Sequence, residues 1–130
     1  MKFGYTIIYV DSVPEALKFY KDAFGFETRF LHESGQYGEL ETGNTTLAFA
    51  SHSLGEMNIG GRYQKTNPST APLGVELAFI TEDVDKAYTK AISAGAVSMA
   101  APSKKPWGQV VAYVRAKEGS LIEICSPMGG

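Results

Sequence analysis

Two glutamates lie inside apolar segments typical of β-strands, where a carboxylate is chemically conspicuous. Glu76 falls in residues 74–80 and Glu123 in residues 120–125. A carboxylate among apolar side chains is costly unless it is paired, hydrogen-bonded or protonated. Either glutamate could therefore bind a cationic ligand, and Glu123 could act as a general base if its pKa is raised. The alternative is a solvated carboxylate that is hydrogen-bonded to a neighbour such as Tyr5.

Three aromatic side chains could offer flat surfaces to a planar ligand. Strand alternation puts Tyr5 and Tyr9 on one face of the first strand. Trp107 stands in the tight sequence PWGQ, just before another strand-like segment. An aromatic ring at the mouth of a pocket can stack on a planar molecule. Trp107 could equally cap the fold or pack against a second subunit.

The other reactive side chains give weaker signals. His32 and His52 are expected at the surface or rim of the fold. Cys125 has no histidine beside it in the sequence, so we expect a small buried hydrophobe rather than a nucleophile. Arg62 and Tyr63 could fold over a ligand if the polar segment that contains them is a flap.

The first half of the chain predicts the sheet that would hold these residues. Tyr5–Val10 is rich in β-branched and aromatic residues, as a buried strand requires. Ser12 and Glu15 form a capping box at the start of a helix, and Gly25 ends that helix. Three further strands are expected at residues 27–33, 37–42 and 45–50.

The same order of elements repeats in the second half. A strand is expected at 74–80, a helix between the cap Asp83 and the stop Gly95, and three strands at 97–101, 109–114 and 120–125. The coincidence of caps, stop glycines and trailing strands indicates a duplicated β-α-β-β-β unit. We expect a single domain, 1–130, with an N-terminal module at about 1–52 and a C-terminal module at about 73–130. Residues 53–72 are too long and polar for an ordinary connection, which predicts a linker or flap.

Composition narrows the partners and the location. The 130 residues carry 12 Lys and Arg against 14 Asp and Glu, with no dense basic patch, so no nucleic acid is expected as a partner. The single cysteine cannot form an internal disulfide, which suits a reducing compartment. No apolar run approaches the ~18 residues of a membrane span, and the first residues lack a signal-peptide pattern. We therefore expect a cytoplasmic protein that does not enter a membrane.

Four sequence stretches carry a resemblance to a known superfamily. They are YVDSVPEALKFY at residues 9–20, FGF at 24–26, PWGQ at 106–109 and GSLIEI at 119–124. Over essentially its whole length the chain resembles the vicinal-oxygen-chelate superfamily, which includes glyoxalase I, bleomycin-resistance proteins and extradiol dioxygenases. The resemblance implies an α+β fold. Two tandem βαβββ modules would form a cup-shaped, barrel-like mixed sheet with helices outside and a small-molecule cavity between the modules.

Metal-dependent members of that superfamily place ligands on the first and last strands of both modules. The matching positions here are Tyr5, Ala48, Glu76 and Glu123, whereas the enzymes usually have His or Glu. Alanine offers no donor atom and a neutral tyrosine is a weak ligand, so the metal site looks degenerate. We therefore expect no cofactor. The alternative is a divalent metal on the two glutamates, with water filling most of its coordination shell.

The resemblance leaves three functions open. The first is a metal-free binding protein, similar to the bleomycin-resistance branch, for a planar ligand that is amphipathic or cationic. Its expected ligand-contacting residues are Tyr5, Tyr9, Ala48, Glu76, Trp107 and Glu123. The second is a lyase or isomerase of the glyoxalase I (lactoylglutathione lyase) type, either metal-assisted or with Glu123 as the catalytic base. An extradiol dioxygenase ranks lowest, because no histidine stands at the required positions. The resemblance also implies a homodimer, with modules paired within or between chains.

Overall fold

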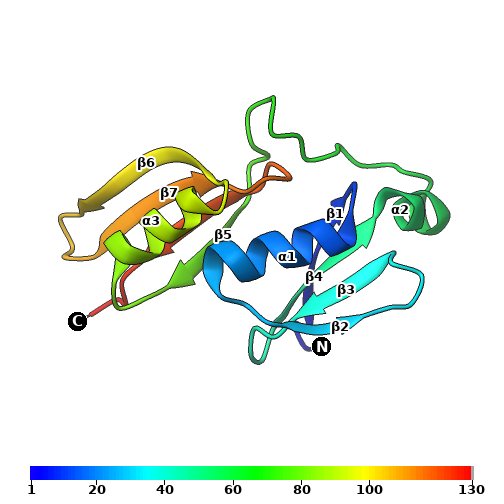
Figure 1. Ribbon diagram of the computed structural model, residues 1–130, viewed down its shortest axis with the longest axis horizontal. Helices are drawn as coiled ribbons and strands as arrows, with labels where there is room; N and C mark the ends of the chain where they lie inside the picture. Colours follow the sequence, from blue (N-terminus) through cyan, green and yellow to red (C-terminus); the bar gives the residue numbers. More distant parts are fainter. Residues whose placement is uncertain (130) are drawn as a thin grey trace. The chain divides into compact units, whose positions relative to one another are not determined.

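Two compact units divide the chain, and each contains a sheet of its own. The computed structural model describes residues 1–129. The first unit comprises Met1–Lys65 and the second begins at Thr66. Figure 1 follows both units along the sequence, from blue at the N-terminus to red at the C-terminus.

The N-terminal module is a four-stranded mixed sheet. Its elements are β1 (Tyr5–Val10), α1 (Val13–Phe24), β2 (Thr28–Leu31), β3 (Tyr37–Leu40), β4 (Thr46–Ser51) and α2 (His52–Ile59). The strand order across the sheet is β1-β4-β3-β2. Strand β1 pairs with β4 in parallel, and the other two pairs are antiparallel.

The C-terminal module repeats this arrangement. Its elements are β5 (Glu76–Ile80), α3 (Val84–Ser93), β6 (Val97–Lys104), β7 (Val110–Arg115) and β8 (Leu121–Cys125). The strand order is β5-β8-β7-β6, and β5 pairs with β8 in parallel. The predicted α+β class and the two βαβββ modules are therefore confirmed. The cup that would join the two modules stays a prediction.

Local capping explains where the two long helices begin and end. The Ser12 hydroxyl accepts a hydrogen bond from the Glu15 N–H (3.3 Å), and Asp83 Oδ1 accepts one from the Lys86 N–H (3.1 Å). Gly25 ends α1 with a φ of 80°, a left-handed conformation that glycine adopts without a steric penalty. Within residues 1–129, none of the helices is long and apolar enough to cross a bilayer.

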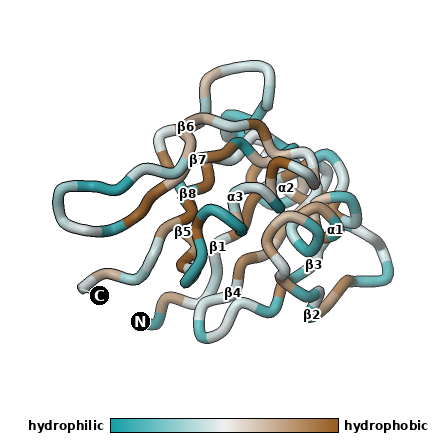
Figure 2. Tube along the Cα trace, turned by 60° about the vertical axis from the view of Figure 1, so that its left-hand side comes forward, coloured by the Kyte–Doolittle hydropathy of each residue, from teal (hydrophilic) through white to brown (hydrophobic). Residues whose placement is uncertain are grey.

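Each sheet buries the face that carries its helix. In the N-terminal module, Tyr20 of α1 packs against Phe49 of β4 with ring centroids 4.9 Å apart. Gly38 lets the helix approach, because a Cβ at this position would lie 2.7 Å from Leu17 Cδ1. In the C-terminal module, Ile122 and Ile124 are buried, and Figure 2 shows the apolar course of β7 and β8. We call the opposite face of each sheet its open face, and alternation assigns Glu123 to it.

The segment expected to be a linker or flap begins with a helix that the sequence analysis missed. Helix α2 follows β4 directly, and the Ser51 hydroxyl caps it by accepting from the Leu54 N–H (3.1 Å). Of its residues only Gly55 is buried, so the helix has no apolar stripe that periodicity could reveal. Strand β6 also runs on to Lys104, beyond the expected end at residue 101, with irregular pairing to β7.

Arg115 ties another part of the same segment to the C-terminal module. Its guanidinium donates to the backbone carbonyls of Gly119 (2.9 Å), Thr70 (3.0 Å) and Asn67 (3.0 Å). Only 8% of Arg115 is exposed. Gly119 is needed beside it, because a Cβ there would lie 2.7 Å from the backbone carbon of Asn67. Residues 67–70 are therefore a packed part of the second unit.

Replacing Arg115 with methionine should lower the free energy of unfolding by about 2–4 kcal/mol, because it leaves the carbonyls of Gly119, Thr70 and Asn67 without this donor. Urea titration followed by circular dichroism measures this change. Lys104→Met, at an exposed position of the same sheet, is the matched control and should change stability by less than about 0.5 kcal/mol. Equal stability of the two variants would contradict the proposed anchoring role.

Candidate functional site

The open face of the C-terminal sheet brings three polar side chains together around Glu123. The parallel register places Glu123 beside Ala78 of β5, with Glu76 two residues back along that strand. On the other side, Tyr113 of β7 is the antiparallel partner of Glu123. Side chains directly or diagonally opposite on one face of a sheet are within reach of each other. The sheet therefore gathers two carboxyls and one phenol on one surface.

The three groups interact with one another. Tyr113 Oη donates to Glu123 Oε1 at 3.0 Å. The pKa of Glu76 is raised by partial burial and by the interaction with Glu123. A nearby like charge disfavours ionisation of a carboxyl, so Glu76 holds its proton more readily than an isolated glutamate does.

The neighbouring groups are held in their neutral forms. Burial raises the pKa of Tyr113 to about 12, and the hydrogen bond to Glu123 adds to the effect. Burial raises the pKa of Cys125 to about 11, again with a contribution from Glu123. Cys125 is 4% exposed, as the sequence analysis expects. A buried thiol with a raised pKa is a poor nucleophile.

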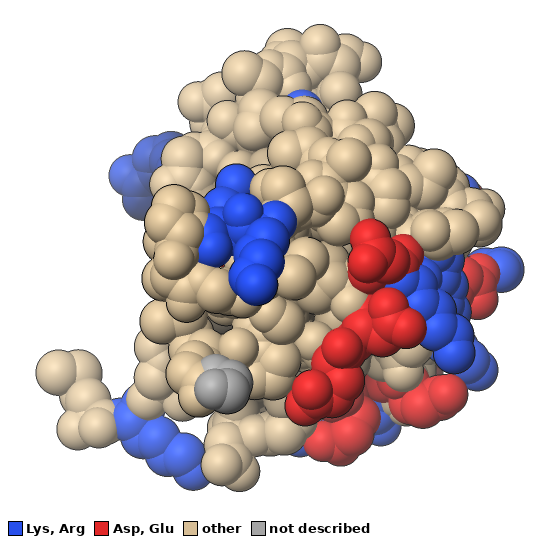
Figure 3. Space-filling model, turned by 90° about the vertical axis from the view of Figure 1, so that its left-hand side faces the viewer, with Lys and Arg blue, Asp and Glu red and all other residues tan. Residues whose placement is uncertain are grey.

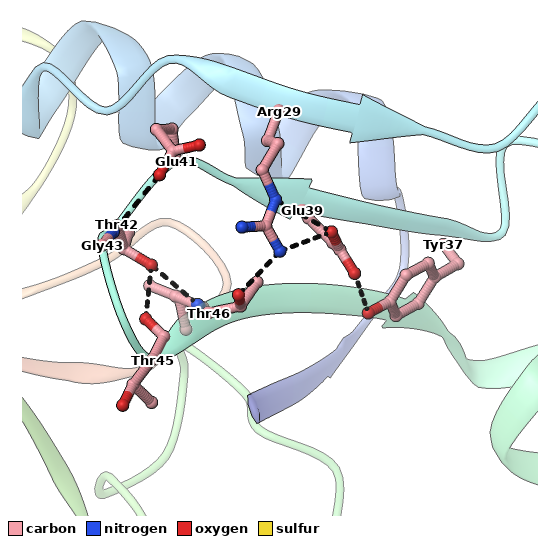
Figure 4. A network of polar contacts seen from close by, with 9 residues as sticks. Arg29, Tyr37, Glu39, Glu41, Thr42, Gly43, Thr45 and Thr46 are labelled. Atoms are coloured by element: carbon pink, nitrogen blue, oxygen red, sulfur yellow. Dashed lines mark hydrogen bonds and ion pairs between the residues drawn. The ribbon is translucent and has the colours of Figure 1, made fainter. Parts of the chain in front are cut away.

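A second polar network lies on the open face of the N-terminal sheet (Figure 4). Arg29 donates through Nε (3.2 Å) and Nη2 (2.9 Å) to Glu39 Oε1, and Nη2 also donates to the Thr46 hydroxyl (2.7 Å). Tyr37 Oη donates to Glu39 Oε2 at 2.8 Å. Both oxygens of this largely buried carboxylate therefore have donors, and the network links β2, β3 and β4.

The network places the Glu39 carboxylate next to Ala48, which the resemblance matched to a metal-ligand position. Glu39 is the register partner of Ala48, whose other neighbour is Ile7 of β1. Burial opposes ionisation of Glu39, but the hydrogen bonds from Tyr37 and Arg29 outweigh it and lower the pKa of the carboxyl. The charge beside Ala48 is thus already neutralised by Arg29.

Tyr9, on the same open face, is covered by another aromatic ring. Tyr63 stacks on it with centroids 4.6 Å apart and an interplanar angle of 22°. The Tyr63 hydroxyl lies 2.7 Å from Nδ1 of His52, whose Nε2 lies 3.3 Å from Asp11 Oδ1. The His52 side chain is only 15% exposed, and burial lowers its pKa, helped by Lys65 and opposed by Asp11. His52 is therefore partly buried, which excludes a fully exposed surface position and is compatible with a position at the rim of the fold.

The predicted ligand-contacting residues fall into separate groups. Glu76 and Glu123 lie together in the C-terminal module. Tyr5, Tyr9 and Ala48 share the open face of the N-terminal module, where Tyr5 is 55% exposed. Trp107 stands on the hairpin before β7, where it donates to Gln109 (2.9 Å) and is 62% exposed. The ligand role of Trp107 therefore remains a prediction.

The sequence analysis missed the partners of these residues. Tyr113 and Glu39 lie in strands that it placed correctly, at 109–114 and 37–42. Period-two alternation within those strands could have put both side chains on the open faces. Arg29 gave no such signal, because the pairing of β2 with β3 shifts register between Thr28 and Phe30.

The donor set does not fit a resident four-ligand metal. Ala48 has no donor atom. Among the described residues, no group of three or more His, Cys, Asp or Glu side chains is arranged to hold a metal ion.

On the face drawn in Figure 3, basic side chains are interrupted by neutral and acidic surface.

Two βαβββ modules of this topology are found in a known protein family. The chain belongs to the glyoxalase-like domain family, whose sequence pattern matches residues 3–129. This confirms the resemblance to the vicinal-oxygen-chelate superfamily.

Among similar proteins, the uncharacterized protein YraH of Bacillus subtilis is 29% identical over 125 residues, covering 95% of this chain and 97% of its own. A glyoxalase-related enzyme from Fulvimarina pelagi has a similar structure (TM-score 0.82, 16% identity, 98% of this chain and 88% of that chain). So does a glyoxalase/bleomycin resistance protein/dioxygenase family enzyme from Burkholderia phytofirmans (TM-score 0.82, 23% identity, 97% and 98%). At these identities the two structures show a common fold, and one fold hosts many chemistries.

The Glu39 network gives stability a defined pH dependence. Because the folded-state pKa of Glu39 is lowered, its contribution is complete above the unfolded value, about 4.3, and is lost as the pH falls through the folded value. Glu39→Gln should therefore lower the free energy of unfolding by about 1–3 kcal/mol at pH 7. The difference from wild type should shrink below about pH 4.

Urea titrations at pH 7 and pH 3 measure this difference. Glu27→Gln is the control, because its ion pair with Lys21 is long (3.3 Å) and its side chain is 70% exposed. The control should change stability by less than about 0.5 kcal/mol at either pH. A difference between Glu39→Gln and wild type that does not depend on pH would contradict the role assigned to the charged carboxylate.

Proposed function

We propose that this protein binds a planar small molecule, amphipathic or cationic, at the open face of its C-terminal sheet, without a complete metal site. The observation that carries the proposal is the placement of Glu76 and Glu123 on one face of two adjacent parallel strands, with Tyr113 hydrogen-bonded to Glu123. Tyr113 Oη donates to one oxygen of Glu123 at 3.0 Å, which holds this carboxyl in place on the open face.

The surroundings of the pair support an amphipathic ligand. Ala78 and Ile80 share the face of β5 that carries Glu76 and are exposed, Ile80 to 70%. A ligand could bury its apolar part there while its polar part meets the carboxyls. A bound cation would also let both carboxyls ionise, because it offsets their mutual repulsion. A singly or doubly cationic group on an aromatic frame therefore suits this surface.

A thermal-shift screen of planar aromatic cations tests the proposal. A ligand present at ~100 times its dissociation constant should add ~2.7 kcal/mol to the stability of the wild type. Glu123→Gln should lose most of this stabilisation, because the amide cannot supply the negative charge.

Glu82→Gln is the matched control, since Glu82 is exposed in the same module. It should respond to ligand as the wild type does. The proposal fails if no compound of this class stabilises the wild type, or if a stabilising compound acts equally on Glu123→Gln while circular dichroism shows both folds intact.

The same pair favours one second candidate, a lyase or isomerase of the glyoxalase type. A protonated carboxyl beside an ionised one supplies a general acid and a general base on a single surface. In this candidate Glu123, held by Tyr113, removes a proton from carbon next to a carbonyl, and Glu76 protonates the developing oxyanion.

Assay of the hemithioacetal of methylglyoxal and glutathione, with and without added nickel or zinc, tests this candidate. Glu123→Gln should lower kcat at least 100-fold and Glu82→Gln should leave it unchanged. Turnover that survives in Glu123→Gln would remove Glu123 from the mechanism, and no turnover in the wild type would leave the binding proposal alone.

We also propose that the protein forms the homodimer that the resemblance implies. Apolar side chains are exposed on both edge strands of the C-terminal sheet, Ile80 of β5 and Val97 of β6 (64%). An edge strand with exposed apolar side chains favours association with another strand or chain.

A further inference from the structure

The chain reverses direction at the end of α2 and lays one aromatic side chain on the N-terminal sheet. Gly60 and Gly61 have φ values of 64° and 66°, and their N–H groups bond back to carbonyls of Glu56 (2.9 Å) and Gly55 (3.2 Å). Two successive left-handed residues turn the chain sharply and favour glycine. Residues 62–65, which we call the strap, then run back along α2.

The side chain of Tyr63 fills a place shaped for a phenol. Its ring stacks on Tyr9, and its hydroxyl meets Nδ1 of His52. Gly55 forms a third wall, because a Cβ there would lie 2.5 Å from the Tyr63 hydroxyl oxygen. This position thus combines a flat platform (Tyr9), a polar group at the far end of the ring (His52) and a wall without a side chain (Gly55).

The hydrogen bond between Tyr63 and His52 has a defined donor and acceptor. His52 Nε2 faces the acceptor Asp11 Oδ1 at 3.3 Å. With the proton of a neutral imidazole on Nε2, Nδ1 presents a lone pair and accepts the hydrogen bond from the phenol. A ring without a hydroxyl would leave this partly buried nitrogen unpaired, so the place selects for a hydroxylated ring.

The strap is held mainly by this one side chain. The backbone hydrogen bonds of its first two residues are local, from the Arg62 N–H to the Ile59 carbonyl and from the Tyr63 N–H to the Gly61 carbonyl. Such bonds travel with the strap when it moves. Arg62 and its neighbours Gln64 and Lys65 are exposed. Loss of the Tyr63 contacts would therefore release the segment and uncover Tyr9.

We infer that Tyr63 is a removable cover over a ring-binding subsite on Tyr9, and that a planar phenolic group of a small molecule takes its place. The inference goes beyond the proposed function, because this subsite is built from residues of the N-terminal module alone. The incoming ring stacks on Tyr9, packs on Gly55 and donates its hydroxyl proton to a hydrogen bond with His52. Tyr63 and the strap then move aside.

The probe is p-cresol, which reproduces the tyrosine side chain from Cβ outward. If Tyr63 competes with the probe, Tyr63→Ala should bind p-cresol at least tenfold more tightly than the wild type, because no opening is needed. Toluene, which lacks the hydroxyl, should bind Tyr63→Ala at least tenfold more weakly than p-cresol. The additional change Tyr9→Ala should abolish the gain. Dissociation constants come from NMR titration of the ring resonances.

A second measurement detects movement of the strap in the unaltered protein. Saturating p-cresol should speed tryptic cleavage of the wild type after Arg62 and Lys65, while cleavage after exposed Lys104 stays unchanged. If Tyr63→Ala fails to fold, Tyr63→Phe serves instead. It keeps the stacked ring but loses the bond to His52, and should bind p-cresol more tightly than the wild type does.

Two results would overturn the inference. One is equal p-cresol affinity for wild type, Tyr63→Ala and Tyr63→Phe; the other is cleavage in the strap that p-cresol does not change. Glu123→Gln separates this inference from the proposed function, since it should leave p-cresol binding to Tyr63→Ala intact. Loss of cation binding in that variant therefore tests the C-terminal site alone.

Discussion

Parallel pairing of the first and last strands of each module is the contact on which the other features depend. A parallel pair cannot be closed by a tight turn, so the chain must leave the first strand, cross over and return through a long connection. Here the connection is a helix and two further strands. The pairing brings residues from opposite ends of a module into register, Ile7 with Ala48 in one and Ala78 with Glu123 in the other.

The two modules share this framework but treat charge on their open faces differently. In the N-terminal module, Arg29 neutralises the Glu39 carboxylate and Tyr37 fills its remaining oxygen. In the C-terminal module, Glu76 and Glu123 lie on adjacent strands of one face, and burial together with Glu123 raises the pKa of Glu76. One face is therefore electrostatically complete within its own module, whereas the other keeps the capacity to accept a positive group.

Strand alternation and capping carried the sequence-based prediction a long way. The caps at Ser12 and Asp83 and the glycine after the first helix placed both helices, and period-two alternation placed Glu123 opposite the buried Ile122 and Ile124. Both signals are local, since each depends on residues a few positions apart.

The features that the sequence could not predict depend on contacts between elements that are separated along the chain. Helix α2 lacks an apolar face, so its position is set by the Ser51 cap and by neighbouring strands rather than by periodicity. The pairing of Arg29 with Glu39 follows a register shift in the edge strand. The contact of Tyr63 with Tyr9 exists only because two left-handed glycines turn the chain back on itself.

Gly55 shows how such a contact constrains the evolution of the chain. A glycine inside a helix is about 0.5–1 kcal/mol less favourable than alanine, so drift would ordinarily replace it. At this position even a methyl group would collide with the Tyr63 hydroxyl. The residues at positions 55 and 63 must therefore change together as the family diverges. A lineage that gains a side chain at position 55 must shrink or move the aromatic side chain at position 63, and the Tyr9 ring would then be covered differently.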